Sequence, residues 1–286
     1  MPEGDTVHRL AAYLREHLVG RRLEDARARG QRLALNGQGV MAAEAQGKHL
    51  LLRFDGGAVL RTHLGMYGSW HRYRADGPAP RVRGRVSVAL TASAPPMAEV
   101  FACYNAKEVE LLPAGSGRER ALAAHLGDDL LGPDPDLGRV VARARQLLAP
   151  DTLLVDVLLD QRVAAGIGNV YKSELLFLAG LAPVTTLGQV DDGRLQTIYA
   201  DARRWLSANL GGGARTTRTT ADGAGRLWVY NRAGRPCHRC RTRIASARLG
   251  ARPRGTWWCP ACQAVPTKAR TGGKSGDSSP VSAAGK

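Results

Sequence analysis

The chain has 286 residues, of which 44% are hydrophobic and 23% are charged. This composition is typical of a folded protein with room for two domains, and it excludes a disordered chain. Lys and Arg number 41 against 25 Asp and Glu, and the resulting charge of +16 favours a polyanionic partner, with nucleic acid the first candidate.

No apolar run approaches the length needed to span a bilayer, and the N-terminus lacks the charged and apolar regions of a signal peptide. A basic amphipathic helix, which would bind a membrane surface, is not evident either. We therefore expect a cytoplasmic protein without a membrane partner.

The chain opens with Met1-Pro2-Glu3-Gly4-Asp5-Thr6-Val7-His8. Removal of Met1 would expose Pro2 as a secondary amine, a nucleophile that attacks carbonyl carbon to form an iminium (Schiff base). The neighbouring carboxylate of Glu3 could move the protons that such steps need. The alternative is structural, because a proline followed by an acid is also an ordinary way to begin a helix.

A first helix is predicted from Val7 to about Val19, followed by short strand-like segments broken by Gly and Asp. These runs lie at 32–35, 40–45, 49–54, 58–63, 85–90 and 98–103. Many short strands separated by turn signals predict a β-sandwich or barrel. Asp55-Gly56-Gly57 predicts a hairpin turn, which would bring Gly47-Lys48 and Gly65-Met66 to the same end of one ribbon.

Beyond a linker at Pro113–Gly117 the pattern becomes helical, with helices predicted at 119–126, 137–148, 153–159, 170–179 and 190–209. Between two of them lies Ala164-Ala165-Gly166-Ile167-Gly168-Asn169. Free backbone N–H groups in such a turn, together with the Asn169 amide, can hold a phosphate. A Gly-x-Gly pair is equally consistent with a packing turn.

The positive charge is concentrated near the C-terminus, where thirteen Lys and Arg between Arg215 and Arg270 face a single acid, Asp222. Such a run is usually a solvated face. Here arginines alternate with Trp228, Tyr230, Trp257 and Trp258, a combination that suits contact with phosphates and stacking.

Four of the five cysteines lie in this segment as Cys237-x2-Cys240 and Cys259-x2-Cys262. This spacing predicts one zinc ion held by four thiolates, and a filled tetrahedral shell gives that zinc a structural role. The alternative is a pair of disulfides, which a cytosolic protein would not keep. Cys103 is expected to be a buried free thiol, and residues 266–286, without an apolar pattern, are expected to form a disordered tail.

Several of these stretches, in this order, resemble the formamidopyrimidine-DNA glycosylase and endonuclease VIII family. They are Pro2-Glu3-Gly4, Gly47-Lys48, His63-Leu64-Gly65-Met66, Leu131-Gly132-Pro133, Leu159-Asp160-Gln161, Ala165-Gly166-Ile167-Gly168-Asn169 and the stretch from Arg254 to Gln263. The resemblance spans residues 2 to about 263 and is closest to bacterial endonuclease VIII.

The resemblance implies an α+β multidomain fold with an N-terminal β-sandwich, a helix-two-turn-helix domain and a zinc ribbon. We accordingly expect a catalytic domain at 1–113, a linker at 114–118, a helical domain at 119–213, a basic connection at 214–232, a zinc ribbon at 233–265 and the tail at 266–286.

The resemblance also implies roles for individual residues. Pro2 would attack C1′ of the damaged nucleotide, with Glu3 as its acid/base partner. Lys48 would assist β-elimination and hold a phosphate; alternatively it is a solvated strand lysine. Asn169 and Arg254 would clamp the DNA backbone, and Arg254 is also implied in δ-elimination. Met66, with Tyr67 beside it, would fill the space left by the extruded nucleotide; alternatively Met66 is a core residue.

This sequence departs from the family pattern in three places. Thr6 stands where the family usually has an acid, residues 104–109 lack the Arg-Arg-Phe stretch of the purine-directed branch, and no Arg lies near Leu130. The first two departures favour the endonuclease VIII branch, and the third puts one DNA contact in doubt.

We therefore predict a bifunctional DNA glycosylase and AP lyase of base excision repair that acts on oxidised pyrimidines by β,δ-elimination. Its partner would be damaged double-stranded DNA, its cofactor one structural zinc ion, and it would act as a monomer associated with the nucleoid. The alternatives are a purine-directed glycosylase and a zinc-ribbon DNA-binding protein without catalysis.

Overall fold

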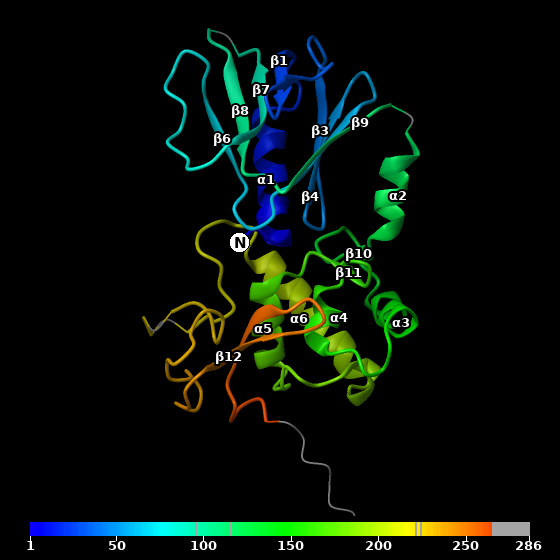
Figure 1. Cartoon of the computed structure of the whole chain (residues 1–286), viewed down its shortest axis with the longest axis vertical. Helices are drawn as coiled ribbons and strands as arrows, with labels where there is room; N and C mark the ends of the chain where they lie inside the picture. The colour runs from blue at the N-terminus through cyan, green and yellow to red at the C-terminus, as the bar shows by residue number, and fades with distance from the viewer. Residues whose placement is uncertain (95, 115, 221, 224, 265–286) are drawn as a thin grey trace, which may run out of the picture.

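The structure is a computed structural model that describes residues 1–264 except 95, 115, 221 and 224. The predicted tail at 266–286 lies outside the described residues. The N-terminus lies between a β-sandwich and a helical region, and the zinc-ribbon strands lie against the helical region (Figure 1).

Helix α1 (Gly4–His17) buries Val7, Ala11 and Leu14, which recur at helical spacing along one face. It begins three residues before the predicted start at Val7. The apolar pattern begins only at Val7, whereas the helix is already started by Glu3, the N-cap residue, in an extended backbone conformation. The catalytic candidates Pro2 and Glu3 therefore stand directly at the start of a helix.

Two antiparallel sheets form the sandwich. One has the order β2-β1-β7-β8-β6 and the other β3-β4-β5-β9. Their strands are β1 (Leu23–Ala28), β2 (Gln31–Arg32), β3 (Val40–Gln46), β4 (His49–Phe54), β5 (Val59–His63), β6 (Ser69–Arg74), β7 (Val86–Ala92), β8 (Glu99–Tyr104) and β9 (Glu108–Leu112). A single core joins apolar residues of both sheets and of α1. Cys103 is part of this core as a free thiol.

The hairpin predicted at Asp55-Gly56-Gly57 joins β4 to β5, with His49 paired to His63 at its far end. Gly47-Lys48 and Gly65-Met66 thus flank the same end of the ribbon. The strand predicted at 32–35 is wrong beyond Arg32, because Leu35 turns into the core through local backbone bonds. Strands β1, β6 and β9 were not predicted, since their apolar residues are interrupted by charged ones.

The helical region contains α2 (Gly117–His125), α3 (Leu137–Leu147), α4 (Leu154–Leu159), α5 (Asn169–Leu178), the 3-10 helix η1 (Leu187–Gln189) and α6 (Asp192–Ala208), with the short parallel pair β10 (Asp128–Asp129) and β11 (Ala164–Ala165). Tyr171 and Tyr199 lie in its apolar core. Helix α2 begins at Gly117, two residues earlier than the predicted helix at 119–126.

Strands β12 (Ala245–Leu249) and β13 (Arg254–Trp258) form the antiparallel hairpin between the two Cys-x2-Cys turns. Strand β13 packs on α5, and Phe177 of α5 joins a small core with Val229 and Cys237. Among the described residues, no helix is long and apolar enough to span a membrane.

Candidate active site

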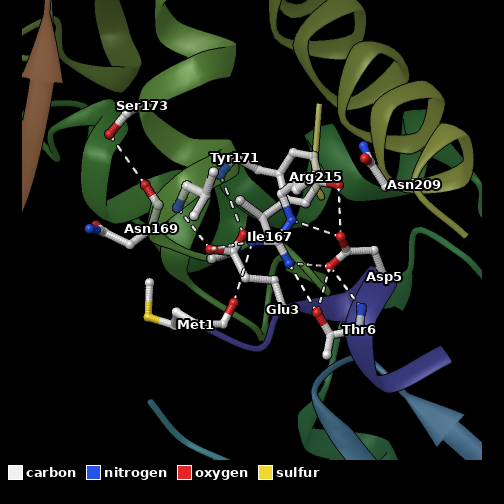
Figure 2. A network of polar contacts seen from close by, with 12 residues as sticks. Met1, Glu3, Asp5, Thr6, Ile167, Asn169, Tyr171, Ser173, Asn209 and Arg215 are labelled. Carbon is white, nitrogen blue, oxygen red and sulfur yellow. Dashed lines mark hydrogen bonds and ion pairs between the residues drawn. The ribbon is translucent and has the colours of Figure 1, made fainter. Parts of the chain in front are cut away.

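The carboxylate of Glu3 lies at the N-terminus of α5. It accepts hydrogen bonds from the backbone N–H groups of Gly168 (2.9 Å), Val170 (2.7 Å) and Tyr171 (3.3 Å), and the side chain is completely buried. Figure 2 shows this carboxylate among residues of α5 and α1. The first N–H groups of a helix have no partner within the helix and carry its positive dipole end, so they suit an anion. Residues 3 and 168–171, far apart in sequence, are held together by this contact.

Glycines make this approach possible. A side chain at Gly168 would place its Cβ 2.3 Å from Cδ of Glu3, so only glycine fits there. Gly4 donates its N–H to the carbonyl of Gly166 at 2.9 Å, and Gly166 has a φ of +115°, which favours glycine. The Gly-x-Gly turn is therefore a packing turn around the N-terminus as well as the start of α5.

A buried ion pair holds the next turn of α1. Arg215 donates to both carboxylate oxygens of Asp5 (2.7 and 2.5 Å) and to the hydroxyl of Thr6 (3.0 Å), and Tyr171 donates to Asp5 at 3.1 Å (Figure 2). Burial alone would lower the pKa of Arg215, but the bonds to Asp5 together with the charges of Glu3 and Asp5 outweigh burial and raise that pKa.

Pro2 lines an open pocket of about 280 Å³ next to this ion pair. Asp5, Thr6, Asn209 and Arg215 are among the other residues of the pocket. With Met1 in place, the nitrogen of Pro2 is an amide and carries no nucleophilic lone pair. Met1 is itself exposed, and its carbonyl accepts a bond from Arg215 at 3.3 Å.

Lys48 reaches the same site from the turn between β3 and β4, donating to the carbonyl of Ile167. The pKa of Lys48 is lowered to about 8, chiefly by burial; the charge of Glu3 opposes this shift, and the charges of Arg215 and Arg254 add to it. The turn is fixed by Asp129, which accepts from the N–H of Gly47 at 2.7 Å and contacts His8 at 2.8 Å. Lys48 is therefore no freely solvated strand lysine.

Asn169 and Arg254 lie on neighbouring elements. The Asn169 amide donates to the carbonyl of Gly255 at 2.9 Å, which joins α5 to β13 directly after Arg254. Arg254 is exposed, and within the described part of the chain its guanidinium has no hydrogen bond or ion pair. Tyr230 packs on Trp257 with ring centroids 4.6 Å apart. Burial raises the pKa of the Tyr230 hydroxyl, and its hydrogen bond with Asn169 partly counters that rise.

Met66 and Tyr67 lie in the turn after β5, and both side chains point largely into solvent, 51% and 77% exposed. The alternative of Met66 as a core residue is therefore wrong. Exposed apolar side chains are common singly, but two adjacent ones on a turn suit a surface that a partner covers.

Sequence reasoning missed Asp5, Asp129, Lys172 and Arg215. Lys172 and Arg215 look like ordinary surface cations in the sequence, because nothing in the local pattern indicates that they are buried. Asp5 was seen only as part of a motif. Their partners lie 80 to 210 positions away in the chain, so no spacing rule applies to them.

The four ribbon cysteines converge, with all their sulfurs within 4.8 Å of one another. The Sγ atoms of Cys237 and Cys262 are 4.0 Å apart and those of Cys240 and Cys259 are 3.4 Å apart. Disulfide sulfurs would be about 2 Å apart, whereas Zn–S bonds of about 2.3 Å in a tetrahedron place sulfurs about 3.8 Å apart. The site fits one structural zinc ion, and the disulfide alternative is wrong.

Three family models match consecutive parts of the chain. They are the formamidopyrimidine-DNA glycosylase N-terminal domain at residues 1–100, the formamidopyrimidine-DNA glycosylase H2TH domain at 131–221, and the zinc finger found in FPG and IleRS at 234–265.

Curated relatives agree along nearly their whole length. A protein of Streptomyces coelicolor described as "Probable endonuclease 8 2" is 40% identical, over 96% of this chain and 98% of its own. The "DNA-(apurinic or apyrimidinic site) lyase Nei2" of Mycolicibacterium smegmatis is 38% identical, over 92% and 99%. Among solved structures, Lactococcus lactis Fpg in a complex with DNA containing an abasic site shares the fold, with a TM-score of 0.76 and 21% identity, over 92% of this chain and 100% of that one.

Proposed function

The chain belongs to the formamidopyrimidine-DNA glycosylase and endonuclease VIII family, and from this premise we propose how its N-terminal site works on damaged DNA. The protein is a DNA glycosylase with AP lyase activity of base excision repair. Its substrate in this proposal is double-stranded DNA that carries an oxidised pyrimidine.

The observation that carries the proposal is the position of Glu3, buried on the N-terminus of α5 and directly after Pro2. Once Met1 is removed, the amine of Pro2 attacks C1′ of the damaged nucleotide. The bond from C1′ to the base breaks first, and the base leaves with the proton of the Pro2 amine. The bond from C1′ to O4′ then breaks, O4′ takes a proton, and the opened sugar remains bound to Pro2 through C1′ as an iminium. Glu3 is the group within reach to give and take the protons of these steps.

Strand cleavage follows from the iminium. Loss of a proton from C2′ expels the 3′ phosphate (β-elimination), and a second elimination expels the 5′ phosphate (δ-elimination). We assign the first step to Lys48, whose pKa of about 8 lets it exist in both charge states near neutral pH. We assign assistance in the second to Arg254, whose guanidinium is exposed towards solvent.

DNA is held from two sides in this proposal. Asn169 and Arg254 bind backbone phosphate where α5 meets β13, through the side-chain amide of Asn169 and the guanidinium of Arg254. Met66 and Tyr67 enter the duplex and fill the space of the extruded nucleotide. The pocket beside Pro2 is the space that receives that nucleotide.

The pyrimidine preference is supported by the turn between β8 and β9. Only Asn105, Ala106 and Lys107 separate the two strands, and Asn105 bonds backbone atoms of Arg83 and Arg85. This turn places Lys107 beside Gly65 but holds none of the residues of the Arg-Arg-Phe stretch that the purine-directed branch adds at this place.

All groups of the proposed site come from one chain, so we also propose that the protein acts as a monomer, bound to chromosomal DNA in the cytoplasm. Light scattering after size-exclusion chromatography, with and without a duplex, would test this. A dimer as the active DNA-bound species would contradict it.

The test of the chemistry is borohydride trapping on three labelled duplexes that carry an abasic site, dihydrouracil or 8-oxoguanine. Two proteins are compared: one whose mass shows that Met1 is absent, and one with a short extension that cannot be removed before Pro2. The extension turns the Pro2 amine into an amide and leaves every other residue in place, which a Pro2→Gly variant does not achieve because glycine also offers an amine.

We expect trapping of the first protein on the abasic and dihydrouracil duplexes, weak trapping on 8-oxoguanine, and none by the extended protein. Equal trapping by the extended protein would exclude Pro2 as the nucleophile. Strong trapping on 8-oxoguanine would reassign the substrate to oxidised purines. DNA binding without any covalent complex would make the chain a binding protein.

A further inference from the structure

Lys172 is a buried charged residue that the proposed chemistry does not use. It lies one turn after Asn169 on α5, with none of its surface exposed. Its Nζ donates to three acceptors: Oδ1 of Asn169 (2.7 Å), Oγ1 of Thr256 (2.7 Å) and the carbonyl of Gly255 (3.1 Å). A lysine ammonium has three protons, so each finds one partner.

Burying the ammonium group of a lysine costs free energy, so a lysine in this position indicates that its contacts have a role. Burial lowers the pKa of Lys172 to about 8, which measures the cost of removing the charge from water. An apolar residue would avoid that cost. The three acceptors indicate what the lysine organises, because two of them belong to β13 and one to the phosphate-binding candidate on α5.

The first contact decides which way the Asn169 amide faces. An amide has a donor end and an acceptor end of nearly equal size, and only its neighbours distinguish them. Lys172 can only donate, so it takes Oδ1; the carbonyl of Gly255 can only accept, so it takes one N–H of Nδ2 at 2.9 Å. The second N–H of Nδ2 faces the Tyr230 hydroxyl, whose pKa it lowers, and in the proposed complex it exchanges this partner for a phosphate oxygen. With the amide reversed, Asn169 would present an oxygen to a phosphate and repel it.

The second contact reaches Arg254. Oγ1 of Thr256 accepts from Lys172 and donates in turn to the carbonyl of Arg254 at 3.1 Å. The chain of bonds from Lys172 through Thr256 therefore fixes the backbone from which the Arg254 guanidinium extends. Since β13 begins at Arg254, this is the point where the ribbon meets α5.

We propose that Lys172 is a positioning residue for phosphate binding, which keeps the N–H end of the Asn169 amide towards the DNA and holds Arg254 of the zinc ribbon in register with it. The inference rests on the proposed function, since it requires Asn169 and Arg254 to bind the backbone. Lys172 itself touches no DNA in this arrangement. It acts on affinity, and the chemistry at Pro2 proceeds without it once the DNA is bound.

The test measures dissociation constants for a duplex with a tetrahydrofuran abasic analogue, in the full-length zinc-bound protein. Lys172→Met removes the donors but keeps the length of the side chain, and we expect about tenfold weaker binding, the usual effect of one lost hydrogen bond to a charged group. Lys172→Gln regains part of this affinity, because its amide N–H can still donate to Asn169. In an Asn169→Ala background, Lys172→Met should add less than about threefold, since two residues in one network are not additive.

Two further measurements separate positioning from general stability. The single-turnover rate of covalent trapping by Lys172→Met on saturating abasic duplex should equal that of the unchanged protein, whereas δ-elimination, which is assigned to Arg254, should slow. Thr256→Val removes the link from Lys172 to Arg254 and leaves the contact of Lys172 with Asn169. It should fold with full zinc content and bind DNA a few-fold more weakly, and it serves as the readout if Lys172→Met does not fold.

Three results would overturn the positioning role. They are an equal loss of affinity from Lys172→Met with and without Asn169, no recovery of affinity in Lys172→Gln, and full affinity of Thr256→Val. If Asn169→Ala weakens binding and Lys172→Met does not, this inference alone fails. If Asn169→Ala binds as tightly as the unchanged protein, the phosphate clamp of the proposed function fails, and the inference fails with it.

Discussion

The start of α1 and the turn after β5, both assigned to DNA in the proposed function, differ in how they are held. Glu3 is fully buried and bound by three backbone N–H groups before any DNA arrives, whereas Met66 and Tyr67 are 51% and 77% exposed. Reacting groups gain from being fixed in advance, since no reorganisation is then needed during the reaction. Groups that replace a nucleotide in the duplex must stay free until the duplex opens. The proposed proton-transfer group is thus buried and fully bonded, whereas the proposed DNA-filling residues are exposed.

The largest effect is expected from Glu3→Gln, which keeps the shape of the side chain and removes its charge. The cleavage rate on an abasic duplex should fall by about 10² to 10⁴, the usual contribution of general acid–base catalysis. Affinity for the tetrahydrofuran duplex should change little. Single-turnover kinetics with both duplexes measures this, and an unchanged rate would remove Glu3 from proton transfer.

Gly168→Ala should disturb the same site through geometry alone. The new Cβ would lie 2.3 Å from Cδ of Glu3, so the carboxylate must move. Displacement by about 1 Å costs roughly 10²-fold in rate, and trapping yields against time would show it. Gly211→Ala is the control, because a Cβ at Gly211 has no neighbour within 4 Å. Equal losses from both variants would count against the packing argument.

Met66→Ala should have a smaller effect, confined to duplex substrates. Excision from duplex DNA should slow about tenfold, corresponding to a loss of roughly 1.4 kcal/mol, while the free energy of unfolding changes by no more than about 0.5 kcal/mol. A single-stranded abasic oligonucleotide leaves no space to fill, so its cleavage should be unaffected. Met41→Ala, at a methionine that is 61% exposed on β3, is the control. Equal slowing on single strands would exclude the void-filling role.

The smallest effect is that of pH on affinity. Lys48 and Lys172 each have a pKa lowered by burial to about 8, so both are charged below that pH and lose charge above it. Binding of the tetrahydrofuran duplex should weaken a few-fold between about pH 7 and 9, with proton uptake on binding near pH 8. In the Lys48→Met variant, only the pH dependence of affinity that is due to Lys172 should remain. A flat profile would show that the charge of neither lysine contributes to affinity, whether directly at Lys48 or through Asn169 at Lys172.

Much of the fold followed from local signals. The hairpin at Asp55-Gly56-Gly57 and the helices after residue 117 carry their own turn residues and periodicity, and the zinc ligands carry their own spacing. Strands β1, β6 and β9 were not predicted because charged residues interrupt the alternation of their apolar residues. At Leu35 the error is the opposite one, because a strand was predicted where none forms. An apolar residue can be buried from a turn as well as from a strand.

Adjacent residues are enough to show the chemistry that each end of the chain can offer: an amine with a neighbouring carboxylate, and four thiolates at zinc spacing. The surroundings of these groups depend on folding, since Glu3 meets the N-terminus of α5, Asp5 meets Arg215, and Lys172 meets β13 across 84 to 210 positions. Burial and long-range hydrogen bonds set the charge and orientation of these groups, and neither is encoded in any single stretch of sequence.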